Sequence, residues 1–391
     1  MTHPKRSGKW TQPIYSPSQV KKAGERLAKL DETNPLFHTS LDIMSNWRAS
    51  HAFPLNTFQM TLRSRALSID PTANVVQRLK RAESIIGKLR RPNRPNLAKM
   101  QDLGGCRAIM LSADLVYQLR NRYMQSKYQT RHQLISEDDY IHNPKPTGYR
   151  GIHLVYEYQS MVQPVYNNLR IELQLRSKLQ HEWATAVEVA DLATKQALKA
   201  GRGSVEWTRF FALMGTVYAN FEGHNPVPGT PEDQDVLIAE IQELNREQRV
   251  LRTLQAYQQL LEVTQMVLAY DSAMDRIGAQ DISLTRRKPS DRNLPFYLLK
   301  LNTDTREVRY MTFSQEEESF ATEVYKEEEI RAAEEGNIDV VVLVAAADEM
   351  ALRQAYPNYF LDIRQFLRTA ALLVPEHERP DLTDSLPADQ S

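Results

Sequence analysis

The sequence of 391 residues has a single cysteine and no long hydrophobic run. Cys106 alone cannot form an internal disulfide, and one cysteine excludes a zinc site built from several thiolates. No stretch of about eighteen apolar residues occurs, so no transmembrane helix is expected. The first residues lead into no hydrophobic region of the kind that a signal peptide needs. We therefore expect a cytoplasmic protein with no membrane partner.

The sequence also lacks net charge, because two halves of opposite charge cancel. Residues 1–200 contain 30 Lys and Arg against 16 Asp and Glu, a net charge of +14, and the remaining residues carry −14. A basic half suits the binding of polyphosphates or nucleic acid. The alternative is a set of basic helix faces that are simply solvated. The length predicts two domains, or one domain with a large extension.

Residues 145–153, with the sequence KPTGYRGIH, have the composition of an anion-binding loop. Gly148 and Gly151 permit backbone conformations closed to other residues and let a ligand approach the main chain. Lys145 and His153 can donate hydrogen bonds to phosphate oxygens, and the ring of Tyr149 can stack on a base. The alternative is a polar hairpin turn, which is the commoner meaning of an isolated Gly-X-X-Gly.

Two carboxylates accompany predicted strands on either side of this loop. Residues 171–176, IELQLR, alternate apolar and polar side chains, which places Glu172, Gln174 and Arg176 on one face of a strand. Asp102 precedes a short apolar segment that is typical of a buried strand. Carboxylates on adjacent strands can share a Mg²⁺, which binds one or two carboxylates together with substrate phosphates. A solvated edge strand would show the same alternation, so only the combination of Asp102 with Glu172 is informative.

The remaining pattern predicts an α/β chain with a mixed sheet flanked by helices. Residues 74–91 are expected to be helical and basic, and residues 237–268 carry a leucine stripe that either packs in the core, the safer interpretation, or pairs with another subunit in a homo-oligomer. A proline-rich break at 225–231 separates the two halves. Strands are expected at 106–111, 128–134, 151–159 and 168–175, with a hairpin formed by 296–301 and 307–312.

Several spaced motifs together resemble the synthetase domain of the RelA/SpoT alarmone synthetases over roughly residues 40–200. The matching segments are QRLK at 77–80, SIIGKL at 84–89, QDLGGCR at 101–107, DYI at 139–141, the loop at 145–153, ELQLR at 172–176 and HEWA at 181–184. One departure is Gly151, where the family commonly has serine.

This resemblance implies a nucleotidyltransferase-like mixed sheet, and the pattern of the residues beyond it predicts a long helix followed by a small C-terminal α/β module. The expected regions are a helical N-terminal part at 1–70, the synthetase core at 71–224, a long helical segment at 232–280, the C-terminal module at 294–374 and a disordered tail at 375–391.

The resemblance further implies transfer of pyrophosphate from ATP to the ribose 3′-hydroxyl of GDP or GTP. It assigns catalysis and Mg²⁺ binding to Asp102 and Glu172, with acceptor contacts from the loop and the neighbouring strands. Phosphates of ATP would be bound by Arg78, Lys80, Lys88 and Arg107, and the acceptor by Lys145, Tyr149, His153 and Gln174.

Two other functions stay open at this point. Some toxic relatives transfer pyrophosphate to the 3′ end of tRNA with similar motifs, and a non-catalytic domain could sense nucleotides without turnover. Long relatives also carry a hydrolase domain with a His-Asp pair, but no His-Asp dipeptide occurs in this sequence. We therefore expect synthesis without hydrolysis of the product.

Overall fold

The computed structural model divides the chain into two compact units. The first comprises Met1–Asp138, Ile152–Ser177 and Ile277–Ala355, and the second comprises Asp139–Gly151, Lys178–Arg276 and Tyr356–Ser391. The structure describes residues 10–258, apart from 32, 126–130, 195–197, 199–202 and 257, and residues 295–379, apart from 302–307, 315–316, 318–319, 323, 326, 329–330, 332–339 and 347–362.

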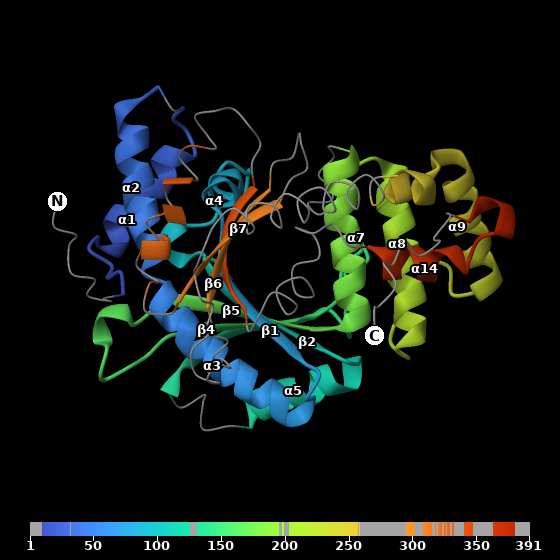
Figure 1. Ribbon diagram of the computed structural model, residues 1–391, viewed down its shortest axis with the longest axis horizontal. Coiled ribbons are helices and arrows are strands. Elements are labelled where there is room, and N and C mark those ends of the chain that lie inside the picture. Colours follow the sequence, from blue (N-terminus) through green and yellow to red (C-terminus); the bar gives the residue numbers. More distant parts are fainter. Residues whose placement is uncertain are drawn as a thin grey trace, which may run out of the picture. The chain divides into compact units, whose positions relative to one another are not determined.

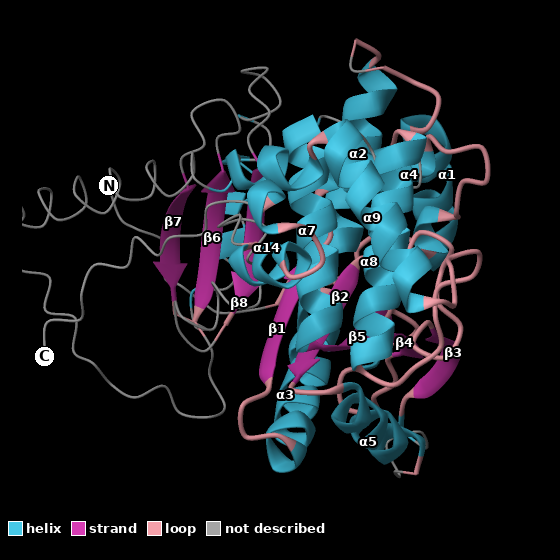
Figure 2. Cartoon of the chain, turned by 90° about the vertical axis from the view of Figure 1, so that its right-hand side faces the viewer, coloured by secondary structure: helices cyan, strands magenta, loops and turns pink. Residues whose placement is uncertain are grey.

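The first unit is built on an eight-stranded sheet in the order β3-β4-β5-β2-β1-β8-β6-β7 (Figure 2). Strands β2 and β5 are parallel, whereas β1–β2, β4–β5, β1–β8, β6–β8 and β6–β7 pair in antiparallel fashion. The strands are β1 (Asn74–Leu79), β2 (Gly104–Met110), β3 (Gln133–Asp139), β4 (Ile152–Glu157), β5 (Arg170–Ser177), β6 (Phe296–Leu301), β7 (Val308–Phe313) and β8 (Val340–Ala345). The predicted mixed sheet flanked by helices is confirmed.

Helices α1, α2 and α5 of the first unit begin at side chains that accept from their free backbone N–H groups. Ser16 forms a capping box with Gln19. The side chains of Asn34 and Ser112 each accept a hydrogen bond from a backbone N–H group in the first turn of the helix that follows. These caps fix where the helices start, because the first N–H groups of a helix have no partner within it. The helices are α1 (Pro17–Leu27), α2 (Pro35–Ala49), α3 (Ala52–Ile69), α4 (Ala82–Leu89) and α5 (Ala113–Met124).

Helices α3 and α5 cover one face of the sheet (Figure 1). The ring of Tyr156 on β4 lies 5.7 Å from Phe58 of α3 and 6.0 Å from Tyr123 of α5, measured between ring centroids. Cys106 on β2 donates to the backbone oxygen of Leu55. Since this face is buried and apolar, the alternating polar side chains of the strands lie on the opposite face.

The helical prediction for residues 74–91 is wrong in its first half. Residues 74–79 form β1, and the helix α4 begins only at Ala82. Strand β1 lies inside the sheet between β2 and β8, and Val75, Val76 and Leu79 are buried there. The tertiary pairing therefore overrides a basic composition that looks helical, since strand preference depends on packing against neighbours. The strand predicted at 128–134 also starts later, at Gln133.

The C-terminal strands are part of the same sheet, although the sequence suggests a separate module. The predicted hairpin is confirmed as β6 and β7. Strand β8 pairs with β1 through Gln77 with Ala345 and Arg78 with Val344. Helix α14 (Arg364–Ala371) packs instead in the second unit. The predicted 294–374 region thus contributes to both units, and the other proposed boundaries stay predictions.

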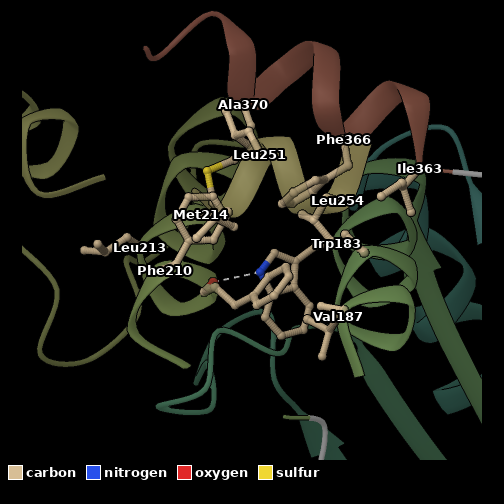
Figure 3. Close-up of a cluster of buried hydrophobic side chains, with 14 of the residues drawn as sticks. Trp183, Val187, Phe210, Leu213, Met214, Leu251, Leu254, Ile363, Phe366 and Ala370 are labelled. Carbon is tan, nitrogen blue, oxygen red and sulfur yellow. Dashed lines mark hydrogen bonds between the residues drawn. The ribbon is translucent and has the colours of Figure 1, made fainter. Parts of the chain in front are cut away.

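The second unit is a helical cluster around Trp183 (Figure 3). The Trp183 Nε1 donates to the backbone oxygen of Phe211 at 2.8 Å, and Phe210, Met214 and Phe366 are buried with it. Besides α14, the helices are α7 (Lys178–Thr194), α8 (Val205–Phe221) and α9 (Gln234–Gln248).

The predicted long helix at 232–280 is interrupted. Helix α9 ends at Gln248, and Arg249 has a left-handed φ of 52°. Leu237, Ile241 and Leu251 from the leucine stripe are buried in the core of this unit. Core packing therefore explains the described part of the stripe, while residues 259–294 lie outside the described residues.

In the part of the chain that the structure describes, no helix combines the length and the apolar character needed to cross a membrane. Of the tail predicted to be disordered, residues 376–378 form a short 3-10 helix, and residues 380–391 lie outside the described residues.

Two glycines should respond in opposite ways to replacement by alanine. A Cβ at Gly148, whose φ is +93°, would lie 2.6 Å from the backbone oxygen of Phe211 and 2.8 Å from Trp183. Gly148→Ala should therefore lower the free energy of unfolding by about 1–3 kcal/mol. Gly87 in helix α4 has nothing within 4 Å, so Gly87→Ala should be neutral or stabilising by up to about 1 kcal/mol.

Thermal unfolding followed by circular dichroism measures both effects. An unchanged or higher midpoint for Gly148→Ala would contradict the packing described for Gly148, and a lower midpoint for Gly87→Ala would contradict the open space at Gly87.

Candidate active site

One face of the sheet in the first unit collects most of the predicted site residues. Residues paired across neighbouring strands point to the same side of a sheet. Arg78 pairs with Gly105, which pairs with Glu172. In the next row, Arg107 pairs with Gln174, which pairs with His153. Because the rows are two residues apart, both belong to the face opposite α3 and α5.

Asp102 lies just before β2 and is held by two lysines. Its Oδ2 is 2.9 Å from Lys80 Nζ and its Oδ1 is 3.0 Å from Lys88 Nζ. Lys80 follows β1, and Lys88 lies on α4, so a strand end and a helix converge on this carboxylate. Burial would raise the pKa of Asp102, but the charges of Lys80 and Lys88 outweigh it and lower the pKa to about 2.

The pKa of Lys80, the partner of Asp102 in this ion pair, is also shifted. Burial lowers the pKa of Lys80, and the neighbouring Asp102 offsets this only in part. Removing both charges from water costs free energy that their attraction must repay. The net contribution of the pair to stability is therefore smaller than the shift at Asp102 suggests. Two cations on one carboxylate leave a net positive charge, which suits a polyphosphate.

Glu172 on β5 is held by side chains of its own and the adjacent strand. Its Oε1 lies 2.9 Å from His153 Nδ1, and its Oε2 accepts from Gln174 Nε2 at 2.8 Å. Burial would raise the pKa of Glu172, but the hydrogen bond and charge of His153 outweigh it, so the pKa is lowered. Glu172 is therefore a carboxylate at neutral pH.

The two carboxylates are close enough to influence each other. The charge of Asp102 is among the groups that raise the pKa of Glu172, against the stronger effect of His153. Among the described residues, no group of three or more His, Cys, Asp or Glu side chains could hold a metal ion. This donor set fits Mg²⁺, which takes one or two protein carboxylates and fills its remaining positions with phosphate oxygens and water.

The arginines predicted to bind ATP lie on the same face. Arg78 is half-buried on β1, at the residue that also pairs with β8. Arg107 is 8% exposed, and its Nη2 donates to Gln174 Oε1 at 3.5 Å, the long end of the hydrogen-bond range. Arg107 thus contacts a residue that the sequence assigned to the acceptor, while Lys80 and Lys88 meet at Asp102.

The loop residues Lys145 and Tyr149 belong to the second unit. Lys145 Nζ lies 5.2 Å from the centroid of the Tyr149 ring and 4.2 Å from that of Tyr140. Tyr149 is half-buried and makes edge contacts with Tyr140 and Trp183, at centroid distances of 5.8 and 6.3 Å. These contacts enclose part of the Tyr149 ring, which the sequence analysis assigned to stacking on a base.

Two further loop residues have structural explanations. The buried Arg150 donates through Nη2 to the backbone oxygen of Ile141 at 3.2 Å, which ties the two ends of the loop together. Gly151 has a φ of 144°, a conformation that residues with a Cβ rarely adopt. Glycine, in place of the serine that is common in the family, therefore matches the backbone conformation at residue 151.

Comparison with known proteins relates one part of the chain to a described family. Residues 77–197 match the family described as "Region found in RelA / SpoT proteins". The matched region contains the end of β1 and strands β2 to β5, together with Asp102 and Glu172. This match agrees with the resemblance that the motifs predict.

Named relatives are similar to part of the chain. GTP pyrophosphokinase YjbM of Bacillus subtilis (strain 168) is 30% identical over 117 residues, covering 29% of this chain and 54% of the relative. GTP pyrophosphokinase YwaC of the same organism is 28% identical over 121 residues, covering 30% of this chain and 56% of the relative. The chain thus spans about half the length of the curated relatives it matches.

Two solved structures match part of the chain at low identity. Small alarmone synthetase 1 from Bacillus subtilis, bound to its product pppGpp, is 20% identical with a TM-score of 0.38, and the match covers 44% of this chain and 89% of that one. A GTP pyrophosphokinase family protein from Streptococcus pneumoniae is 20% identical with a TM-score of 0.38, covering 51% and 93%.

The buried charge of Asp102 should appear in the pH dependence of stability. Its pKa is about 2 in the folded chain, below the usual 3.8. The stability from its charged form is therefore fully present above about pH 4 and is lost as the pH falls through about 2. Asp102→Asn should flatten this dependence by at most about 2 kcal/mol, because burial of Lys80 offsets part of the pair.

Urea unfolding of both proteins between about pH 2 and 5 measures the difference. Parallel pH profiles for wild type and Asp102→Asn would mean that Asp102 is not paired as described.

Proposed function

We propose that this chain is an alarmone synthetase that transfers the β,γ-pyrophosphate of ATP to the 3′-hydroxyl of GDP or GTP. The 3′-oxygen forms a bond to the β-phosphorus, the bond between that phosphorus and the α,β-bridging oxygen breaks, and AMP leaves. The hydroxyl proton passes to a base. The acceptor is inferred from the GTP pyrophosphokinase names of the curated relatives. These nucleotides are intracellular, in agreement with the expected cytoplasmic location.

The observation that carries this proposal is the meeting of Asp102, Lys80 and Lys88 at the entry to β2, close enough to Glu172 for the charge of Asp102 to act on its pKa. Asp102 with its lysines forms a positive cluster suited to a triphosphate. Glu172 presents an ionised carboxylate two strands away from Arg78. A donor site and a base on one face are what phosphoryl transfer requires, since its catalysis consists mainly of positioning and charge stabilisation.

The residues near Asp102 would bind the donor. Lys80 and Lys88 would shift from Asp102 towards phosphate oxygens when ATP is present. Arg78, on the strand β1 that precedes Lys80, would add a third positive charge. Mg²⁺, held by Asp102, would neutralise charge on the transferred phosphates. This arrangement lets one carboxylate hold the lysines in place before the donor arrives.

Glu172 would accept the proton of the acceptor hydroxyl. Its pKa is lowered, so it is unprotonated and ready to accept a hydrogen bond at neutral pH. Tyr149 would stack on the acceptor base through the part of its ring that remains accessible, and Lys145, which is exposed, would contact acceptor phosphates.

Loss of the base should abolish most of the activity. With γ-labelled ATP, Mg²⁺ and GDP or GTP, the wild type should form a 3′-pyrophosphorylated guanosine nucleotide and release AMP. Glu172→Gln keeps the shape but removes the charge, so kcat should fall by about 10²–10⁴-fold. A matched control is Glu157→Gln on the adjacent strand β4, whose partner is Arg170 at 3.6 Å, and it should retain wild-type activity.

Absence of labelled product from the wild type with both guanosine nucleotides would remove the alarmone proposal. Nucleotide binding without release of AMP under any acceptor would instead indicate a sensor.

A second candidate acceptor is the 3′ end of tRNA, favoured by a basic surface beside α4. Lys21 on α1 and Arg94 line one pocket of about 160 Å³, together with Glu25. Arg90 and Arg91 at the end of α4 are exposed, and Arg90 Nη2 donates to the oxygen of Leu30 beyond α1 at 3.4 Å. Lys88, which contacts Asp102 at 3.0 Å, lies on the same helix within one turn of Arg90 and Arg91.

This surface separates the two acceptors experimentally. If tRNA is the acceptor, label should pass to deacylated tRNA and be lost when the terminal 3′-hydroxyl is blocked. Arg90→Gln combined with Arg91→Gln should then weaken tRNA binding and reduce its slope against the logarithm of salt concentration by about 2. Transfer to GDP or GTP should be unchanged, because a mononucleotide does not extend to this surface.

An unchanged salt slope in this variant, with label still passing to tRNA, would show that Arg90 and Arg91 do not contact the RNA.

A further inference from the structure

Each oxygen of the Glu172 carboxylate has a neighbouring polar side chain as its partner. His153 Nδ1 lies 2.9 Å from Oε1, and Gln174 Nε2 donates to Oε2 at 2.8 Å. The side chains of His153 and Glu172 are only 15% and 13% exposed. One partner comes from β4 and the other from β5, so both contacts depend on the register of these two strands.

The second of these partners is itself fixed. Gln174 Oε1 accepts from Arg107 Nη2 at 3.5 Å and from Arg176 Nη2 at 3.4 Å. Arg107 and Arg176 are 8% and 4% exposed. Because its oxygen faces two guanidinium groups, which only donate, the Gln174 amide must turn its NH₂ group towards Glu172. The orientation of Gln174 is thus set by charges on β2 and β5.

These contacts restrict the rotation of the Glu172 carboxylate about its terminal side-chain torsion. The terminal torsion of a glutamate is broad, so an unsupported carboxylate samples many orientations. A carboxylate offers about four acceptor positions, and His153 and Gln174 occupy one on each oxygen. The remaining positions then point in defined directions, which lowers the cost of aligning a base with a reacting hydroxyl.

We propose that His153 and Gln174 are positioning residues that orient Glu172, and that they do not bind the acceptor nucleotide. The inference rests on the proposed pyrophosphate transfer and replaces the acceptor contacts that the sequence suggested for these two residues. The geometry agrees with it: His153 Nδ1 is already paired with the carboxylate of Glu172 at 2.9 Å, so binding an acceptor phosphate through this atom would require His153 to leave that contact.

The two roles differ in their kinetics. A positioning residue acts on the reacting base, so its loss lowers kcat and leaves KM for the acceptor nearly unchanged. An acceptor ligand acts on binding, so its loss raises KM. Gln174→Met and His153→Leu remove the donors while keeping similar side-chain sizes, and kcat should fall about 10–100-fold in each. KM for GDP or GTP should change less than about twofold.

A conservative variant of His153 should restore the kcat that is lost when the donor is removed. His153→Asn can place an amide N–H near the position of Nδ1, so it should recover most of the kcat lost in His153→Leu. Glu157→Gln on the same strand serves as the control for changes to this face, because Glu157 pairs with Arg170 instead. Thermal unfolding of each variant tests whether a lower kcat reflects loss of folded protein.

A double-mutant cycle with Glu172→Gln makes the test sharper. If Gln174 acts only through Glu172, adding Gln174→Met to Glu172→Gln should lower single-turnover rates less than about twofold further, since residues that act as a unit are non-additive. Full multiplication of the two effects, or a rise in acceptor KM with kcat preserved, would overturn the inference while wild-type activity stands. An inactive wild type would overturn the proposed function itself.

Discussion

The parallel pairing of β2 with β5 is the constraint on which the rest of this structure depends. It sets Gly105 beside Glu172 and Arg107 beside Gln174, and it brings Asp102, at the entry to β2, close enough to act on Glu172. A slip of one residue would turn every polar side chain of β5 towards α3 and α5, where the apolar residues now lie. Strong burial of Leu173 and Leu175 on that side therefore fixes the polar face as well.

The polar face is costly to build, because partly buried charges lose hydration. Each of its carboxylates is compensated in a different way. Asp102 has two lysines, whereas Glu172 has a histidine and an amide held in turn by arginines. The first arrangement can exchange its lysines for phosphate oxygens, and the second keeps a single base in one orientation. We interpret this difference as two separate roles, with Asp102 and its lysines binding the donor and Glu172 activating the acceptor.

Much of this site could be predicted from the sequence, because its signals are local. The alternation in residues 171–176 correctly placed Glu172 and Gln174 on one strand face. Residues 74–79 were misjudged because the partners that make them a strand, β2 and β8, lie far away in the chain. For the same reason no pattern predicted that residue 344 pairs with Arg78, that Tyr149 packs on Trp183, or that His153 meets Glu172.

The central claim is that Asp102 and Glu172 serve one nucleotide site on one face of the sheet. A crystal structure with Mg²⁺ and a non-hydrolysable ATP analogue tests it most directly. We predict the metal bound to Asp102, with the β- and γ-phosphates contacting Lys80 and Lys88 and the β-phosphorus facing Glu172. An analogue whose phosphates lie away from this face, or a metal held without Asp102, would contradict the account.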